Sequence, residues 1–147
     1  MVLTLREIHT LEMAEDYPAA IDALEDRLRE DPTECETVVR LGFNLWYAVA
    51  EAMRFKVTLP TDLYAARFIE LYEEYKDRFM DNADFCWAFG LGMSLFPYFF
   101  CGVTEDMGND WLDRAKRLDS FWQDMPSGDF AQRFTGRGIF EKYYGTR

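Results

Sequence analysis

The dipeptide Leu-Gly occurs twice at the same distance behind a helix-stopping residue. Leu41-Gly42 lies nine and ten residues after Pro32, and Leu91-Gly92 lies nine and ten residues after Asn82. A glycine inside a helix costs up to about 1 kcal/mol relative to alanine. Two glycines at equivalent places need a common compensation, which we expect to be close approach of a partner helix's backbone. The recurrence predicts a fold in which one kind of helix pair is repeated.

The stretch before the first Leu-Gly pair carries the spacing of a known helical repeat. Residues 16–21 read Asp-Tyr-Pro-Ala-Ala-Ile, and Leu24, Leu28 and Asp31-Pro32 follow. This pattern resembles the second helix of a tetratricopeptide repeat (TPR), where a tyrosine opens the helix, a small alanine admits the partner and a proline closes the unit. The resemblance implies an all-α fold. Residues 1–147 would form a single domain, built as a TPR-like right-handed solenoid of about three antiparallel helix pairs.

The resemblance is uneven along the chain. The first helix has Glu7-Ile8 where the repeat has Leu-Gly, and Thr135 stands before Gly136 in the last unit. The steps between successive helix stops also exceed the roughly 34 residues of the family. The sequence therefore predicts a divergent stack of helical hairpins, with longer helices or an inserted loop, and not a strict array.

Apolar residues at helical spacing predict a series of helices separated by loops that contain proline or glycine. The expected helices cover residues 5–11, 17–29, 35–55, 61–79, 83–97, 111–122 and 130–144. Thr61 or Asp62 is the expected N-cap of the fourth helix. Residues 102–108 are expected to form a turn, and residues 126–129 a stop followed by a restart.

The formal net charge of −11 is concentrated near the beginning of the chain. Between residues 6 and 36, eleven carboxylates face three arginines. A field of this sign repels phosphate backbones, so we expect no direct nucleic-acid binding. The same field attracts a basic protein, although each carboxylate alone is also what a solvated helix face carries. The chain is 49% hydrophobic and 17% aromatic, which excludes disorder and favours an aromatic core or binding surface.

Cysteine usage and the uncharged segment bear on location. Cys35, Cys86 and Cys101 are odd in number and lack CxxC spacing, which favours a reducing cytoplasm. Cys86 and Cys101 are expected in apolar surroundings. The N-terminus has no basic region ahead of an apolar core, so no signal peptide is expected. Residues 85–104 carry no charge over about twenty residues, but their glycines, proline and acidic flanks favour burial within the stack over a membrane span.

The chain lacks the residues that most enzymes and metal sites require. His9 is the only histidine, so paired-histidine metal sites are excluded, and a catalytic triad would need His9 on the shortest helix. A half-exposed surface imidazole is the expectation instead. The glycine pairs at 90–92 and 136–138 lack the strand-turn-helix context and the Lys-Ser/Thr of phosphate loops. We therefore expect no enzyme activity, no metal and no cofactor.

In the TPR family the first helices of the pairs line a concave face. The resemblance places ten residues on that face, namely His9, Glu12, Phe43, Trp46, Tyr47, Phe89, Met93, Arg133, Arg137 and Phe140. Chaperone-adaptor repeats use lysine and asparagine there to clamp a peptide's terminal carboxylate. Val39 and Phe43 occupy the matching places of the second unit, so that clamp is absent. Trp46 and Tyr47 are either a hot spot for a partner or core between layers.

The size, the acidic charge and the missing catalytic set resemble those of bacterial immunity proteins, which neutralise a cognate toxin. Residues 136–144 are also similar to the endings of such small proteins. The expected partner is then a nuclease or nucleotide-handling toxin domain, whose basic site an acidic or aromatic surface would cover. The alternative is a TPR-like adaptor or secretion chaperone that binds an extended peptide in its concave groove. The candidate partner-binding residues are Glu25, Asp26, Glu30, Asp31, Phe43, Trp46, Tyr47, Glu70, Glu73, Glu74, Arg133 and Arg137.

Overall fold

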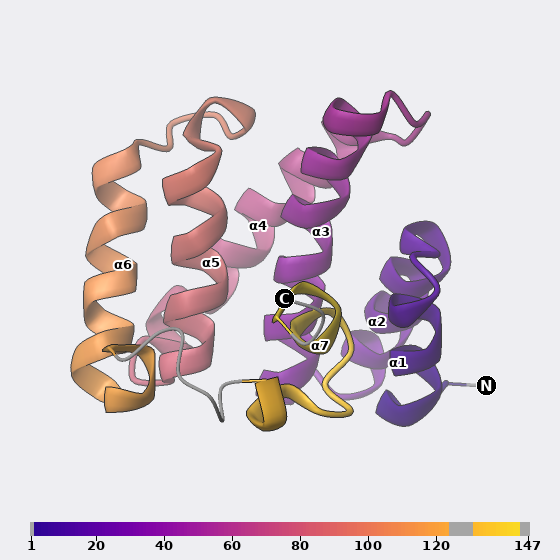
Figure 1. The fold of residues 1–147 in the computed structure, drawn as a ribbon, viewed down its shortest axis with the longest axis horizontal. Coiled ribbons are helices and arrows are strands. Elements are labelled where there is room, and N and C mark those ends of the chain that lie inside the picture. The colour runs from indigo at the N-terminus through magenta and orange to yellow at the C-terminus, as the bar shows by residue number, and fades with distance from the viewer. Residues whose placement is uncertain (1, 124–130, 145–147) are drawn as a thin grey trace.

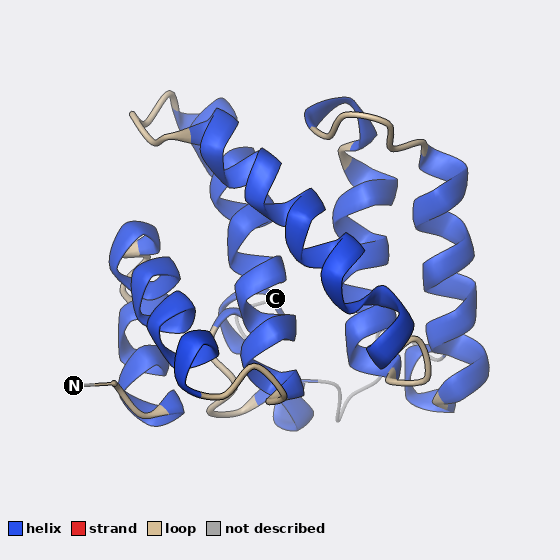
Figure 2. Ribbon diagram, turned by 180° about the vertical axis from the view of Figure 1, so that it is seen from behind, coloured by secondary structure: helices blue, strands red, loops and turns tan. Residues whose placement is uncertain are grey.

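A computed structural model of the protein describes residues 2–123 and 131–144, and every regular element in those ranges is a helix (Figures 1 and 2). The α-helices are α1 (Leu5–Met13), α2 (Tyr17–Glu30), α3 (Cys35–Phe55), α4 (Thr61–Phe79), α5 (Ala83–Leu95), α6 (Glu105–Leu118) and α7 (Ile139–Tyr144). Three short 3-10 helices, η1 (Pro97–Phe99), η2 (Ser120–Gln123) and η3 (Ala131–Phe134), complete the described part. The all-α prediction is confirmed.

Short-range signals in the sequence determine where the first two helices begin. The Thr4 hydroxyl accepts a hydrogen bond from the Glu7 N–H at 3.1 Å, and the Glu7 carboxylate accepts one from the Thr4 N–H at 3.1 Å. This reciprocal capping box satisfies backbone donors that the first turn of α1 leaves unpaired. The Asp16 carboxylate accepts a hydrogen bond from the Ala19 N–H at 3.3 Å and so caps α2, and Pro18 occupies the first turn of that helix. Both helices begin where local chemistry favours a start.

α3 is the central helix of the fold. It packs against α2, α4, α5 and α7, and in Figure 1 it stands between α5 and the pair formed by α1 and α2. Almost all of its side chains from Val38 to Val49 are buried. Because α2 and α4 both pack on α3, their outer faces lie on the same side of the molecule, as the view from behind in Figure 2 shows.

Two glycines and two aromatic rings interlock where α3 meets α5. Three carbons at the tip of the Phe89 ring occupy the space that a Cβ at Gly42 would need. In the reverse direction, a Cβ at Gly92 would lie 2.7 Å from Cγ of Trp46. The Trp46 indole N–H also donates a hydrogen bond to the carbonyl of Ala88 at 3.1 Å. The two Leu-Gly pairs thus belong to one helix contact, but an aromatic ring, and not the expected helix backbone, fills each gap.

Close backbone approach occurs instead between α5 and α6. A Cβ at Gly90 would lie 2.9 Å from a backbone nitrogen of α6, and Gly108 faces the backbone of Ser94. The absence of side chains at both glycines lets the two helices touch along their backbones. α6 begins at Glu105 and includes Gly108, so the expected turn over 102–108 is wrong in its second half.

α6 also ends earlier than its apolar spacing predicts. The helix covers Glu105–Leu118, not 111–122, because Asp119 has an extended backbone and its carboxylate accepts a hydrogen bond from the Phe121 N–H at 3.0 Å. The chain then enters η2, which places Trp122 against Trp87 with their ring centroids 4.5 Å apart. The aromatic residue expected on a helix stripe therefore reaches the core from a separate short turn.

The C-terminal segment covers the face that was expected to be an open groove. α7 contacts α1 and α3 and crosses in front of α3 in Figure 1. One continuous helix over 130–144 is wrong, because η3 ends at Phe134 and α7 begins only at Ile139. Gly136 and Gly138 lie between them with φ of 77° and 60°, a conformation that glycine adopts without strain. Phe130 and residues 126–129 lie outside the described residues.

A buried polar cluster lies beneath this segment. Glu12 is completely buried, and its carboxylate accepts hydrogen bonds from the Arg40 guanidinium, from Asn44 Nδ2 at 2.9 Å and from the Ile139 N–H at 2.7 Å. Glu12 was expected on an exposed concave face, which is wrong because α7 closes over it. A buried carboxylate is tolerated here because charged and neutral donors surround it.

Three smaller expectations are also decided by the structure. α4 begins after Pro60 without a side-chain cap, so neither Thr61 nor Asp62 is its N-cap. Cys86 is buried as expected, whereas Cys101 is exposed in the loop before α6, and both are free thiols. Among the described residues no helix has the length and the apolar character that crossing a membrane requires.

Candidate functional site

The outer faces of α2 and α4 form an acidic surface, which we call the α2–α4 face. It carries exposed carboxylates that make no ion pair within residues 2–123 and 131–144: Asp22, Glu30, Asp31, Asp62, Glu74 and Asp77. Further carboxylates on the two helices are paired with arginine or lysine. Figure 2 shows α2 and α4 together at the front of the view from behind, so these charges act on one side of the molecule.

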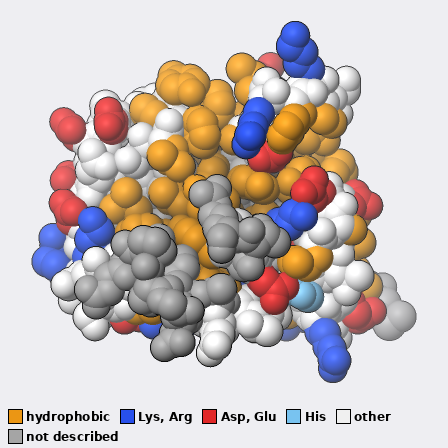
Figure 3. Space-filling model, viewed as in Figure 1, with side chains coloured by type: hydrophobic (Ala, Val, Ile, Leu, Met, Phe, Trp, Pro, Cys, Tyr) orange, Lys and Arg blue, Asp and Glu red, His pale blue; other side chains and the backbone are white. Residues whose placement is uncertain are grey.

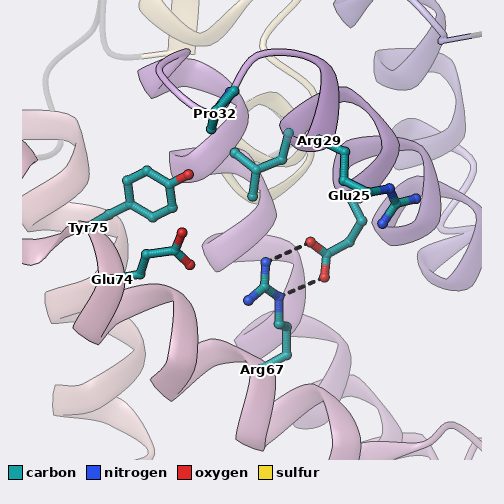
Figure 4. Close-up of a pocket in the computed structure, with 7 residues that line it drawn as sticks. Glu25, Arg29, Pro32, Arg67, Glu74 and Tyr75 are labelled. Atoms are coloured by element: carbon teal, nitrogen blue, oxygen red, sulfur yellow. Dashed lines mark hydrogen bonds and ion pairs between the residues drawn. The ribbon is translucent and has the colours of Figure 1, made fainter.

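A cleft of about 380 Å³ separates the two helices (Figure 4). Its lining comes from α2, from the loop that follows α2 and from α4: Glu25, Leu28, Arg29, Pro32, Arg67, Glu74 and Tyr75. Leu28 and Tyr75 are buried and form part of the floor over α3, while Glu74 and Arg29 are exposed at the rim. The cleft therefore combines an apolar floor with charged walls.

Two arginines of α4 hold the cleft at its ends. Arg67 donates to Glu25 through Nε at 2.7 Å and through Nη2 at 2.9 Å, a bidentate pair that Figure 4 shows bridging the helices. This hydrogen bond to Glu25 raises the pKa of Arg67 above its ordinary value. At the other end, Arg78 donates to the carbonyl of Pro32 at 3.3 Å. The two contacts fix the distance between the walls.

Tyr75 and Glu74 present uncommitted polar atoms to the cleft. The Tyr75 side chain is only 3% exposed, and its ring packs on Phe79 with centroids 5.5 Å apart. Its hydroxyl points from α4 toward α2 in Figure 4 and makes no hydrogen bond with the part of the chain that the structure describes. Burial, and then the charge of Glu74, raise the pKa of Tyr75. The hydroxyl therefore stays neutral and can both donate and accept.

The other acidic candidates surround this cleft but differ in what they contact. Asp26 pairs with Arg29 on the same helix, and Glu70 pairs with Arg67 at 3.0 Å. Glu73 pairs with Lys76 at 2.8 Å. Glu25 is the half-buried partner of Arg67, so it is the acidic candidate most firmly held by the fold. Glu30 and Asp31 are exposed near the C-terminal end of α2, where the Asp31 carboxylate accepts hydrogen bonds from the N–H and the hydroxyl of Thr33.

The aromatic candidates are mostly core. Phe43 is fully buried and Trp46 is 1% exposed, so their expected place on an open groove is wrong. Their rings instead pack on the C-terminal segment, with Phe43 and Phe140 centroids 5.1 Å apart. Tyr47 is half-buried and lines a hollow of about 230 Å³ with Phe96 and neighbouring residues. Figure 3 shows apolar side chains gathered over this part of the molecule, between the ends of α3 and α5.

The two arginine candidates are paired with carboxylates of the same chain. Arg137 donates to both oxygens of Glu36, at 2.7 and 2.9 Å, and to Asp84 at 2.9 Å. Burial alone would lower the pKa of Arg137, but hydrogen bonds and charges from these two carboxylates raise it above its ordinary value. Arg133 pairs with Asp119 and lies 4.0 Å above the Phe121 ring. Both side chains join the C-terminal segment to the helices.

His9 has an internal partner as well. Its Nδ1 accepts a hydrogen bond from the Gly138 N–H at 2.7 Å, and its Nε2 lies 3.4 Å from Glu141. The side chain is partly exposed, as expected, but it contacts the C-terminal segment and not open solvent alone. Its geometry is that of a contact between helices.

Sequence reasoning missed Arg67 and the role of Tyr75 in the cleft. Tyr75 was assigned to the core stripe of α4, which is correct for its ring but says nothing about its hydroxyl. A local signal existed for Arg67, because Glu70 follows it by three residues on the same helix. The pairing of Arg67 with Glu25 depends on the packing of α2 and α4 on α3, and helical spacing alone does not give it.

Among the described residues, no group of three or more histidine, cysteine or carboxylate side chains is arranged to hold a metal ion. Comparison with models of known protein families, with characterised proteins and with solved structures finds no match to this chain.

Proposed function

We propose that this protein acts by binding another protein, as an immunity protein that neutralises a cognate bacterial toxin domain. The α2–α4 face is the surface we assign to this contact. The observation that carries the proposal is the gathering of unpaired carboxylates around a cleft with uncommitted polar groups. No enzymatic role of its own is part of the proposal.

The charge of this face favours a basic partner. Carboxylates on two neighbouring helices add their fields on one side of the molecule, which raises the rate at which an oppositely charged protein is captured. Nucleases and nucleotide-handling enzymes have basic sites because they bind phosphate. A toxin domain of either kind is therefore the partner that this surface suits, and direct nucleic-acid binding remains disfavoured.

The arrangement of helices is compatible with a divergent TPR-like solenoid, which we retain as part of the proposal. α3 packs on the helix before it, on its own partner α4 and on α5, as the first helix of a middle repeat would. α7 then lies on the side where such a stack has its concave face. In this interpretation the protein uses its outer surface for binding, because the inner one is already covered.

A peptide-binding adaptor is the second candidate, and one observation favours it. Leu95 is 45% exposed and Tyr98 is 76% exposed beside the hollow lined by Tyr47, Phe96 and Tyr143. Exposed apolar side chains next to a hollow are common at protein-binding sites. An adaptor of this kind would bind its peptide at the end of α3 and not in the covered groove.

Co-expression tests the main proposal. Cells that produce the C-terminal region of the protein encoded immediately upstream should die, and they should survive when the present chain is produced with it. Association of the two purified proteins should slow as salt rises, because the screening length falls from about 30 Å at 0.01 M to about 8 Å at 0.15 M. Cells indifferent to this chain, together with tight binding of an extended peptide, would favour the adaptor.

A matched pair of charge-reversal variants locates the contact. E30K/D77K reverses two unpaired carboxylates of the α2–α4 face, and D110K/D113K reverses two exposed carboxylates of α6. Both variants have the same net charge. We expect the first to lower the association rate at least several-fold more than the second, since steering depends on where the charge lies. Equal effects of the two variants on the association rate would contradict the assignment of the α2–α4 face as the contact surface.

A further inference from the structure

The cleft between α2 and α4 has the features of a receptor for one cationic side chain. Its floor is formed by Leu28 and the ring of Tyr75, which offer apolar area to an aliphatic stem or a planar group. Glu74 stands exposed at its rim and makes no ion pair with residues 2–123 or 131–144. A single pocket of this kind accepts one side chain and not a continuous peptide.

The uncommitted atoms in the cleft are the ones a cation requires. Both arginines that line it are occupied, Arg67 by Glu25 and Glu70 and Arg29 by Asp26. The groups left over are the Glu74 carboxylate and the Tyr75 hydroxyl. An anion would have to displace an existing carboxylate from either arginine of the lining, and Arg78 at the end of the cleft already donates to the Pro32 carbonyl, whereas a cation finds acceptors that are not in use.

The Tyr75 hydroxyl is an independent reason to expect a ligand. Tyr75 is only 3% exposed, yet its hydroxyl is directed into the cleft in Figure 4 and makes no hydrogen bond with the described part of the chain. The hydroxyl is not among the polar atoms that the described part of the chain encloses without a partner, so it is accessible from the cleft. It can therefore accept a hydrogen bond from a ligand's N–H.

We propose that this cleft binds an arginine side chain of the partner protein, with the guanidinium paired to Glu74 and hydrogen-bonded to the Tyr75 hydroxyl. Arginine suits the site better than lysine, because its planar guanidinium can lie on the apolar floor while its several N–H groups reach two acceptors at once. The assignment rests on the proposed function, and it supplies an anchor at the centre of the acidic face.

The first experiment uses a small probe in place of the unidentified partner. N-acetyl-arginine amide is titrated into the protein at low salt, and binding is followed by NMR chemical shifts. N-acetyl-citrulline amide, which has nearly the same shape without the charge, is the matched probe. We expect weak saturable binding of the arginine probe, with shift changes centred on Tyr75, and at least tenfold weaker binding of the citrulline probe.

Variants then test the two assigned contacts. Glu74→Gln and Tyr75→Phe should each weaken the arginine probe about tenfold, since a hydrogen bond to a charged group contributes that much to affinity. Asp110→Asn removes the same charge from an exposed position of α6, outside the α2–α4 face, and should leave the affinity nearly unchanged. Tyr75→Phe retains the ring that packs on Phe79, so its fold is preserved, and the melting temperature of each variant checks this.

Several results would overturn the assignment. Citrulline binding as tight as arginine binding, or an Asp110→Asn effect equal to that of Glu74→Gln, would show a general surface effect. Binding of inorganic phosphate with shifts at Arg29 and Arg67, and none of the arginine probe, would show an anion site.

The cleft and the proposed function can fail separately. If the toxin domain is neutralised and E30K/D77K slows its capture, but Glu74→Gln and Tyr75→Phe leave its affinity unchanged, only the cleft assignment fails. If the arginine probe binds as described and no toxin is neutralised, the proposed function fails and the cleft assignment stands.

Discussion

Replacing Gly42 by alanine tests whether the interlocked contact between α3 and α5 stabilises the fold. A Cβ at this position would overlap the tip of the Phe89 ring. The ring has little room to retreat, because its centroid lies 4.4 Å from that of Phe85 and 5.0 Å from that of Phe68, both stacked on it. The substitution therefore has to strain the core.

The expected magnitude follows from two opposing terms. Overpacking of a tight core costs about 1–3 kcal/mol. Alanine is favoured over glycine inside a helix by about 1 kcal/mol. We expect Gly42→Ala to lower the free energy of unfolding by about 1 kcal/mol, and the bulkier Gly42→Leu to lower it further.

A second substitution reverses the sign. Phe89→Leu removes the three ring carbons that the new Cβ would meet. In that background only the helix-propensity term remains, so Gly42→Ala should raise the free energy of unfolding by about 1 kcal/mol. The four proteins form a double-mutant cycle whose coupling is about 2 kcal/mol by this reasoning.

Equilibrium urea unfolding followed by circular dichroism measures all four free energies, and an unchanged slope with denaturant shows that the two-state treatment holds. The contrary result is that Gly42→Ala raises the free energy of unfolding by the same amount in the wild-type protein and in the Phe89→Leu variant. Such a result would mean that the glycine has no packing role and that the recurrence of Leu-Gly has no physical basis.

Other measurements test the buried groups. A thiol reagent should label Cys101 rapidly in native buffer but Cys86 only in denaturant, because burial encloses the Cys86 thiol and raises its pKa to about 11. Mass spectrometry locates the labelled cysteine, and rapid labelling of Cys86 in native buffer would contradict this prediction. Glu12→Leu should cost about 3–5 kcal/mol by removing the closest carboxylate from the buried Arg40, which keeps only a 4.0 Å contact with Glu36 as an ion pair among the described residues, and adding Arg40→Met should recover much of that loss in urea unfolding. Stability should also fall in acid, because a hydrogen bond from Arg27 lowers the pKa of Glu34 in the folded protein. The stabilisation from this pair is fully present above the ordinary pKa of 4.5 and is lost as the pH falls through the lower pKa of the folded state. Glu34→Gln should flatten that part of the curve of urea midpoint against pH.

Most of the helices could be predicted from the sequence because their signals are local. Apolar spacing and the Asp31-Pro32 stop identify α2, and the long stripe from Val38 to Val49 identifies α3. Some errors lie where a local turn ends a helix early, as at Asp119, and others where a long-range contact overrides the local pattern. Gly108 reads as a loop residue in sequence, yet it belongs to α6 because its missing side chain lets α5 approach.

The site was predictable only in part, for a similar reason. The acidic character of α2 and α4 follows from counting charges along their outer faces. Which carboxylates remain unpaired depends on partners far apart in sequence, as with Glu25 and Arg67. The burial of Phe43 and Trp46 depends on where the C-terminal segment lies, and helical spacing within α3 gives no information on that.

The placement of the C-terminal segment also affects where unpaired carboxylates remain on the surface. Arg137 pairs with Glu36 and Asp84, and Lys142 pairs with Glu15 at 2.9 Å, so cations from the end of the chain neutralise carboxylates beside α7. The α2–α4 face lies on the other side of the molecule, as Figures 1 and 2 show, and it receives none of these cations. The carboxylates of the α2–α4 face therefore keep their charge and add to the negative field on that side of the molecule. A partner of the proposed kind would meet there the Glu74 carboxylate and the Tyr75 hydroxyl, which lack partners within the described chain.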